Sequence, residues 1–341
     1  MACYHPLKGF PIGFTKNGKV DYKITGYDAA CVVKEGDKVD VYGYVVDSSI
    51  VGVSGRVICD YIDIPCGQCI GCRLQRSADW ACRCMLESKY HSFNYFFTLT
   101  YDDLFVPRSS YIDKDTGELC SINTLYKRDL QNFWKRLRKR VDYKFKYYAC
   151  GEYGTKTARP HYHAIVFGLE VPDLELWKQS NSGFNLYISE WINSIWKKGY
   201  VVIGDVTFES CAYVARYIMK KQTGEASSVY DDYNLEPEFN CMSLKPAIGL
   251  EYFSDHYDDI YRNDEIILPE GRVVSPPRYF DKKYDLIDEE DMQNIKDKRS
   301  DLAAKIKSWK ESRTTQSYQD LLRSEEIAKK GSIKRLVRPL E

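Results

Sequence analysis

The sequence lacks an excess of charge of either sign, because 49 Lys and Arg residues balance 49 Asp and Glu residues. Any surface that binds nucleic acid must therefore be local rather than global. The sequence also lacks an apolar run long enough to cross a bilayer, and it does not start with a basic segment followed by an apolar one. We therefore expect no signal peptide and no membrane association.

Histidine is scarce, with five residues, whereas cysteine is not, with twelve. Nothing in the sequence indicates export, so we expect a reducing cytoplasm in which the thiols are free or bound to metal. Three of the cysteines form the stretch Cys66-Gly-Gln-Cys-Ile-Gly-Cys72. Its two overlapping Cys-x-x-Cys steps suit a tetrahedral thiolate site, and the glycines let the backbone turn around an ion.

Three thiolates leave a fourth ligand to be found for this ion. The first candidate is Cys3 and the second is His5, because both lie in a terminal segment that otherwise needs tying down. Free thiols are the alternative, and an iron–sulfur cluster would use the same ligands, although nothing in the sequence indicates redox work. The sequence thus predicts a structural Zn²⁺ site formed by Cys3, Cys66, Cys69 and Cys72.

Two stretches rich in aromatic, β-branched and apolar residues, 147–153 and 161–168, are expected to form strands joined by residues 154–160. Side chains alternate along a strand, so His161 and His163 share one face. An antiparallel return would place Glu152 beside both imidazoles. Two imidazoles and one carboxylate can hold a divalent cation and leave positions open for a substrate oxygen. A pair of solvated histidines is the alternative interpretation.

Residues 208–222 contain neither Gly nor Pro and include good helix formers, which predicts a helix. Tyr213 and Tyr217 are four residues apart and share one helical face, while Lys220 and Lys221 follow about one turn further on. The tyrosines also fit core-facing aromatics, and the lysines a solvated cap.

Residues 125–141 are amphipathic, with apolar positions on one face and a dense basic face opposite. Such a face can follow a DNA backbone by releasing counterions, and a solvated surface is the alternative. The candidate phosphate contacts are Lys135, Arg136, Arg138, Lys139 and Arg140.

The expected strands and helices alternate as β-α-β-β-α-β followed by a last helix. This order predicts an α+β fold of ferredoxin-like kind, in which helices pack on an antiparallel sheet. Residues 222–240 are expected to be a polar loop. The predicted segments are a β-rich N-terminal region with the cysteine cluster (1–90), an endonuclease-like core (91–225), an extension packed on that core (226–281) and a charged helical tail (282–341).

Three motifs carry a resemblance to a known family: Gly151-Glu-Tyr-Gly154, Arg159-Pro-His-Tyr-His163 and Tyr213-Val-Ala-Arg-Tyr-Ile-Met-Lys-Lys221. They resemble the rolling-circle replication initiators of the HUH endonuclease superfamily, and most specifically those of the small single-stranded DNA phages of the Microviridae (gokushovirus group). Further matching stretches, in the order of that family, are 65–75, 97–101 and 277–281.

The resemblance implies a metal-dependent nickase that starts and ends rolling-circle replication. Mg²⁺ or Mn²⁺, held by Glu152, His161 and His163, would polarise an oxygen of the scissile phosphate. A tyrosine hydroxyl would attack in line and leave a free 3′-OH and a 5′-phosphotyrosine. The implied substrates are single-stranded DNA and the origin of the phage replicative form, in the cytoplasm of a bacterial host, with a host helicase as a further candidate partner.

The resemblance to two-tyrosine initiators implies that Tyr213 and Tyr217 alternate as the attacking group and the tethered group. Because an ordinary phenol has a pKa near ~10, Lys220 and Lys221 are candidates for favouring the phenolate or for holding the phosphate. Two other functions remain open at this point. One is a phosphoesterase that uses activated water, and the other is a non-catalytic, zinc-containing DNA-binding protein.

Overall fold

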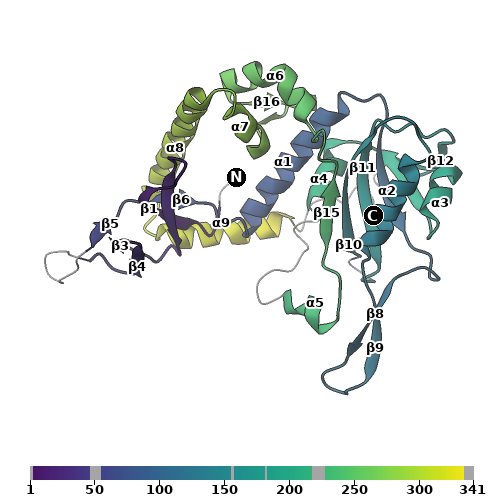
Figure 1. Cartoon of the computed structure of the whole chain (residues 1–341), viewed down its shortest axis with the longest axis horizontal. Coiled ribbons are helices and arrows are strands. Elements are labelled where there is room, and N and C mark those ends of the chain that lie inside the picture. The colour runs from purple at the N-terminus through teal and green to yellow at the C-terminus, as the bar shows by residue number, and fades with distance from the viewer. Residues whose placement is uncertain (1–2, 47–54, 155–156, 181–182, 217–226, 334–341) are drawn as a thin grey trace. The chain divides into compact units, whose positions relative to one another are not determined.

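The computed structural model of the chain describes residues 3–46, 55–154, 157–180, 183–216 and 227–333 (Figure 1). The chain divides into two compact units. One unit combines Met1–Gln75 with Lys307–Leu336, and the other spans Arg76–Ile306. The four segments predicted from the sequence are not the same division, and their boundaries stay a prediction.

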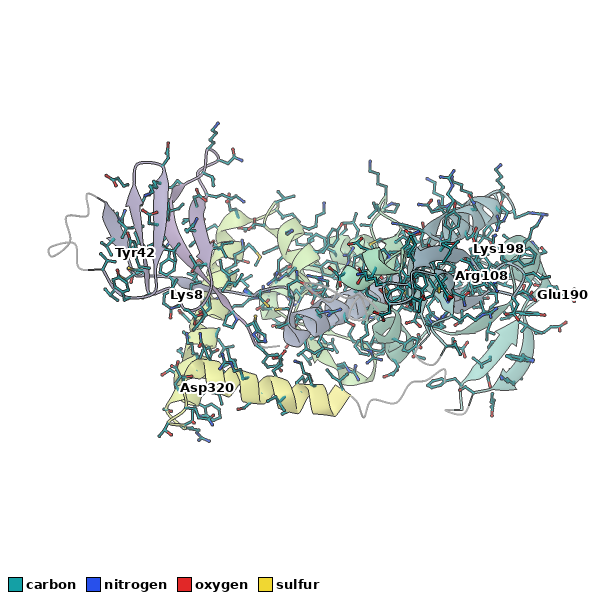
Figure 2. The ribbon with its side chains drawn as sticks, turned by 90° about the horizontal axis from the view of Figure 1, so that it is seen from below. Lys8, Tyr42, Arg108, Glu190, Lys198 and Asp320 are labelled. Atoms are coloured by element: carbon teal, nitrogen blue, oxygen red, sulfur yellow. The ribbon has the colours of Figure 1, made fainter. Side chains whose placement is uncertain are left out.

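The first unit contains two small antiparallel sheets, with strand orders β2-β1-β6 and β4-β3-β5. Figure 2 shows its side chains, with Lys8 in β1, Tyr42 in β4 and Asp320 in α9 labelled. Its strands and its C-terminal helix are β1 (Leu7–Phe14), β2 (Val20–Thr25), β3 (Cys31–Glu35), β4 (Lys38–Tyr42), β5 (Arg56–Ile58), β6 (Ile62–Ile64) and α9 (Tyr318–Ile333). The predicted β-rich N-terminal region is therefore present.

The C-terminal end of the chain packs within this first unit. Lys307, near the end of α8 (Glu289–Glu311), contacts a carboxylate oxygen of Asp63 at 3.0 Å and the hydroxyl of Tyr27 at 3.1 Å. In α9, Glu326 accepts a hydrogen bond from His5, with an Nε2–Oε2 distance of 2.8 Å. Residues from the two ends of the sequence thus fold together, which local sequence patterns do not predict.

The second unit is built on a seven-stranded sheet with the order β12-β13-β14-β7-β11-β10-β15, in which all neighbouring pairs are antiparallel. Its strands are β7 (Asn94–Thr100), β10 (Lys146–Tyr153), β11 (Pro160–Phe167), β12 (Glu175–Gln179), β13 (Asn185–Ile188), β14 (Val201–Asp205) and β15 (Phe239–Met242). The central part, β14-β7-β11-β10, has the strand order of a ferredoxin-like fold. The predicted α+β class is confirmed.

Helices cover both faces of this sheet. On one face, α2 (Lys127–Arg138) and α3 (Glu190–Trp196) pack on alternate strand residues such as Tyr162 and Val166. On the other face, α1 (Ile70–Ser88), from Ala81 onward, and α4 (Phe208–Arg216) pack on Phe96, Ile165 and Phe167. Figure 1 shows α2 and α4 on opposite sides of the sheet.

Local signals explain where α3 and α4 begin. The Ser189 side chain accepts a hydrogen bond from the Ile192 N–H at 3.0 Å, as predicted for an N-cap residue. At the start of α4, Thr207 and Ser210 exchange hydrogen bonds, since each side chain accepts from the other's backbone N–H at 3.1 and 2.8 Å. The helix that carries Tyr213 is therefore anchored directly after β14.

Several elements were not predicted. A hairpin of β8 (Arg108–Ile112) and β9 (Leu119–Asn123) precedes α2, and β15 adds an edge strand beside β10. The expected loop at 222–240 instead contains α5 (Ser228–Asp232) and the start of β15 in its described part. The remaining elements are α6 (Leu250–Asn263), β16 (Ile266–Ile267), a 3-10 helix (Pro269–Gly271), β17 (Val273–Val274) and α7 (Arg278–Tyr284).

Across the described part of the chain, none of the helices combines the length and the apolar character that crossing a membrane requires.

Candidate active site and metal-binding groups

The first candidate site lies on the hairpin of β10 and β11. The register pairs Glu152 with His161 and Cys150 with His163, so the carboxylate stands directly beside the first histidine. Side-chain alternation sends Tyr162 to the opposite face, where it belongs to the core under α2. The face that carries both histidines is the face covered by α4.

The three polar side chains converge on one point. The Nε2 atoms of His161 and His163 lie 2.6 and 3.3 Å from the same oxygen of Glu152, Oε1. Glu152 and His163 are 2% and 3% exposed, whereas the side chain of His161 is 19% exposed and forms the accessible edge of the group. One potential ligand atom from each residue lies within 4.8 Å of the others.

The outer nitrogen atoms of both rings are oriented by oxygen partners. His161 Nδ1 lies 3.1 Å from the backbone carbonyl oxygen of Arg159, which can only accept, so Nδ1 carries the proton. His163 Nδ1 lies 3.0 Å from the hydroxyl of Thr98 on β7, the strand residue paired with His163. With both Nδ1 atoms as donors, the Nε2 lone pairs point toward Glu152.

This arrangement fits a divalent cation. Two imidazole lone pairs and a carboxylate oxygen are all acceptors, so a positive charge between them is needed to bind them together, whether a proton or a metal ion. Two neutral imidazoles and one carboxylate are a ligand set that divalent transition metals accept, and three ligands leave positions open for a substrate oxygen. The donor set therefore suits the predicted Mg²⁺ or Mn²⁺, without defining which ion binds.

The charge state of Glu152 supports the same conclusion. Burial alone would raise the pKa of Glu152, but hydrogen bonds from His161 and His163 lower it well below its ordinary value. The carboxylate is therefore ionised at neutral pH, as a metal ligand must be.

Tyr213 lies beside this group. Its ring meets the ring of His163 edge to face, with the centroids 5.4 Å apart, and it lies 6.2 Å from the ring of Phe96 on β7. Cys211, Val214 and Ala215 on α4 are buried against the sheet and α1, which fixes the helix on this face. Tyr217, Lys220 and Lys221 lie outside the described residues.

The five basic residues predicted to contact phosphates lie in or just after α2, on the other face of the sheet. Arg136 donates to the backbone carbonyls of Ile195 and Trp196 at 2.7 and 3.0 Å, and the Arg138 guanidinium lies over the ring of Tyr147 at 5.5 Å. These two side chains thus have structural contacts. Lys135, Lys139 and Arg140 are exposed. DNA contact by this face stays a prediction, and it would be separate from the Glu152 group.

A second candidate metal-binding group lies in the first unit. Cys3, Cys66, Cys69 and Cys72 bring four sulfur atoms within 4.8 Å of one another. Cys3 thus joins the motif as predicted, whereas the alternative ligand His5 faces Glu326 instead. Burial alone would raise the pKa of the Cys69 thiol, but hydrogen bonds from the backbone of Cys72 and Tyr4 lower it to about 7.

Sequence reasoning did not find Thr98 and Arg159 as partners of the histidines. The available signal was weak: Thr98 lies in the expected strand 94–101, and only the register between β7 and β11 places it opposite His163. Arg159 contributes through its backbone carbonyl, and its side chain is held by Asp103 at 2.5 Å and by the Tyr101 carbonyl at 2.7 Å.

The fold and the site define a class of protein: an antiparallel sheet presents a carboxylate and two imidazoles beside a helix that bears a tyrosine. The comparisons with known proteins agree with this class. The family model of the replication-associated protein ORF2 matches residues 94–222, which include the whole hairpin and α4.

Three phage proteins are similar to the chain. Replication-associated protein ORF2 of Spiroplasma virus 4 is 34% identical, with 100% of this chain and 99% of the relative covered. Replication-associated protein VP4 of Bdellovibrio phage phiMH2K is 32% identical, with 76% and 77% covered. Replication-associated protein ORF4 of Chlamydia phage 1 is 31% identical, with 64% and 52% covered. No solved structure matches the chain.

The chain belongs to the family of replication-associated proteins of these small phages. The resemblance to rolling-circle replication initiators that the motifs indicated is thereby confirmed.

Proposed function

We propose that this protein is a site-specific, metal-dependent single-strand DNA nickase and strand-transfer enzyme. It would start and end rolling-circle replication of a small phage genome in the cytoplasm of a bacterial host. Membership of the replication-associated family supports the role in replication. The observation that carries the chemistry is the position of Tyr213, whose ring lies 5.4 Å from the ring of the candidate ligand His163.

Each residue has a defined role in this proposal. Glu152, His161 and His163 hold the divalent cation, which when bound polarises a phosphate oxygen and stabilises the charge of the transition state. His161, the most exposed of the three, marks the side from which a phosphodiester enters. Burial of Glu152 and His163 keeps solvent from that side of the group.

A tyrosine hydroxyl of the helix that begins as α4 attacks the phosphorus atom. The new bond joins the phenol oxygen to phosphorus, the bond from phosphorus to the 3′ oxygen breaks, and the leaving oxygen takes up a proton to become the 3′-OH. The 5′ end stays on the protein as phosphotyrosine. Tyr213 and Tyr217 are both proposed as attacking groups, so that a second cut can follow while the first end is held. Lys220 and Lys221 are proposed to favour the phenolate or to hold the phosphate.

The test is a cleavage reaction with single-stranded oligonucleotides that together span the phage genome, in the presence of Mn²⁺. Label at the 3′ end of the DNA should stay with the protein on a denaturing gel, whereas label at the 5′ end should appear in a free fragment that ends in 3′-OH. The double substitution Tyr213→Phe with Tyr217→Phe should abolish cleavage and leave DNA binding intact.

The matched control is Tyr200→Phe, because the Tyr200 side chain is 66% exposed and lies in the same unit. This variant should cut like wild type. Cleavage retained in the double variant would refute the roles of the two tyrosines. Cleavage without label on the protein would indicate activated water as the nucleophile, and full activity of His161→Ala would indicate that the site is not catalytic.

A further inference from the structure

The cysteine cluster of the first unit takes no part in the proposed chemistry and has a geometry of its own. We infer that Cys3, Cys66, Cys69 and Cys72 bind one Zn²⁺ as a structural, four-thiolate site. All four potential ligands come from the protein, so such a site has no open position for a substrate. It is therefore distinct in kind from the three-ligand group on β10 and β11.

Strand pairing explains how Cys3 reaches a motif more than 60 residues away. β1 and β6 are antiparallel, with Leu7 opposite Ile64 and Gly9 opposite Ile62. Extended by four residues beyond Leu7, this register places Cys3 opposite position 68, between Cys66 and Cys69. The fold thus delivers the fourth sulfur atom to the site, and the ion would close the open end of the strand pair.

The sulfur atoms are spaced for metal coordination and not for a disulfide. The Sγ atoms of Cys3 and Cys69 are 3.8 Å apart, far longer than the ~2.05 Å of a disulfide bond. A tetrahedral ion with Zn–S bonds of ~2.3 Å has sulfur–sulfur edges of ~3.8 Å. The cysteines of the cluster are free thiols in the structure.

Backbone N–H groups surround the cluster as they would surround thiolates. Cys66 Sγ accepts from the N–H groups of Gln68 and Cys69 at 3.4 and 3.3 Å. Cys3 Sγ accepts from the Cys66 N–H, and Cys69 Sγ from the Tyr4 N–H, both at 3.3 Å. Hydrogen bonds to a charged acceptor favour the charged form, so these donors would offset part of the negative charge of four thiolates around one Zn²⁺.

The site is tested on the full-length protein by elemental analysis for zinc and iron. About one zinc per chain is expected in wild type, since a structural zinc is retained through purification when affinity is high. Zinc should fall to a small fraction of this value in Cys3→Ser and in Cys69→Ser. Absence of zinc from wild type, or iron in its place, would overturn the inference.

Three controls separate the ligands from their surroundings. Cys59→Ser changes an exposed cysteine of the same unit outside the cluster, and His5→Ala removes the rejected ligand candidate, so both should keep their zinc. His161→Ala alters the other candidate metal site and should also keep it. Full zinc content in Cys69→Ser would contradict the ligand set.

A spectroscopic measurement covers the case in which the serine variants fail to fold. Wild-type protein stripped of zinc and loaded with Co²⁺ should show the strong visible absorption of tetrahedral cobalt with thiolate ligands, and one equivalent of Zn²⁺ should remove it. Cobalt absorption typical of oxygen and nitrogen ligands alone would contradict a four-thiolate site.

Discussion

Each imidazole of the candidate active site is held from behind by an oxygen atom. Arg159 offers a backbone carbonyl to His161 at 3.1 Å, and Thr98 offers a hydroxyl to His163 at 3.0 Å. Such partners fix the tautomer and orientation of a metal-binding histidine, and their loss typically weakens metal binding. Thr98 is therefore a positioning residue for the cation, although it does not reach the ion itself.

The prediction is that Thr98→Val lowers the affinity for Mn²⁺ by about 10- to 100-fold, because the His163 ring loses the acceptor that keeps its Nε2 free of a proton. Isothermal titration calorimetry of the full-length protein measures this change directly. Thr98→Ser should restore the affinity to near the wild-type value, since it keeps the hydroxyl.

Thr100→Val is the matched control. It makes the same substitution on the same strand, and the Thr100 hydroxyl donates to the Tyr200 carbonyl at 3.1 Å. Its Mn²⁺ affinity should therefore stay close to that of wild type. Equal affinity in Thr98→Val and wild type would show that the hydroxyl does not orient the ring.

At this scale the sequence predicted what local pattern can determine. Glu152, His161 and His163 belong to one hairpin with a short connection, so alternation and an antiparallel return were enough to bring them together. Thr98 could not be found in this way, because it lies 65 residues from His163 and only the pairing of β7 with β11 makes them neighbours.

At the scale of elements, a close approach between β10 and β15 supports the site strand. A Cβ atom at Gly151 would lie 2.8 Å from the ring of Phe239, the residue paired with it on β15. Gly151 precedes Glu152, so this glycine of the Gly-Glu-Tyr-Gly motif lets the edge strand pack tightly behind the ligand. The motif thus has a packing reason as well as a chemical one.

Gly151→Ala is therefore expected to lower the free energy of unfolding by about 1–3 kcal/mol, the usual cost of overpacking. In the double variant with Phe239→Ala, the added methyl group has room, so the combined loss should be smaller than the sum of the two single losses. Urea unfolding of the four proteins measures this coupling.

Gly204→Ala on β14 serves as the control, because a Cβ atom there would lie 3.8 Å from Leu186, an ordinary contact. It should cost little. Additive losses in the Gly151 and Phe239 variants would contradict the packing explanation.

The elements that the sequence did not predict share a physical cause. β15 is a short edge strand of half-buried residues whose place depends on pairing with β10. β8 and β9 pair with each other, and Ile112 and Leu119 at their open ends are 67% and 77% exposed. Neither case produces the alternation of buried and exposed residues on which strand prediction depends. By contrast, β7, β10, β11 and β14 alternate between two cores and were predicted.

At the scale of the whole molecule, the second unit contains a buried ionic group that joins several elements. Glu87 on α1 is 1% exposed and accepts from His91 Nε2 at 2.7 Å and from the Gly249 N–H at 2.7 Å, and it pairs with Lys146 Nζ at 2.6 Å. Burial alone would raise the pKa of Glu87, but these partners lower it below its ordinary value near 4.5.

Glu87→Gln is expected to lower the free energy of unfolding by about 3–5 kcal/mol at neutral pH, because it leaves the Lys146 charge buried without its counter-ion. A carboxyl group with a lowered pKa in the folded state stabilises the fold fully above its ordinary pKa. That contribution is lost as the pH falls through the ordinary value toward the folded one. The difference between wild type and Glu87→Gln should thus shrink between about pH 6 and about pH 3.

Denaturant unfolding of both proteins across this pH range checks the expectation. Glu118→Gln is a suitable control, because Glu118 is exposed and lies in the turn between β8 and β9. Its difference from wild type should stay small at every pH. A constant difference between wild type and Glu87→Gln would indicate that ionisation of Glu87 does not stabilise the fold.

The central claim is that a tyrosine of the helix beginning as α4 attacks DNA at the Glu152, His161 and His163 site. Trypsin separates the two candidates, since cleavage after Lys198, Arg216 and Lys220 places Tyr213 in peptide 199–216 and Tyr217 in peptide 217–220. Mass spectrometry of protein that has cut DNA with Mn²⁺ should find a nucleotide on one or both of these tyrosines. No such adduct should form with Glu152→Ala. Cut DNA without any nucleotide-linked tyrosine, or with the nucleotide on a residue elsewhere in the chain, would contradict the account.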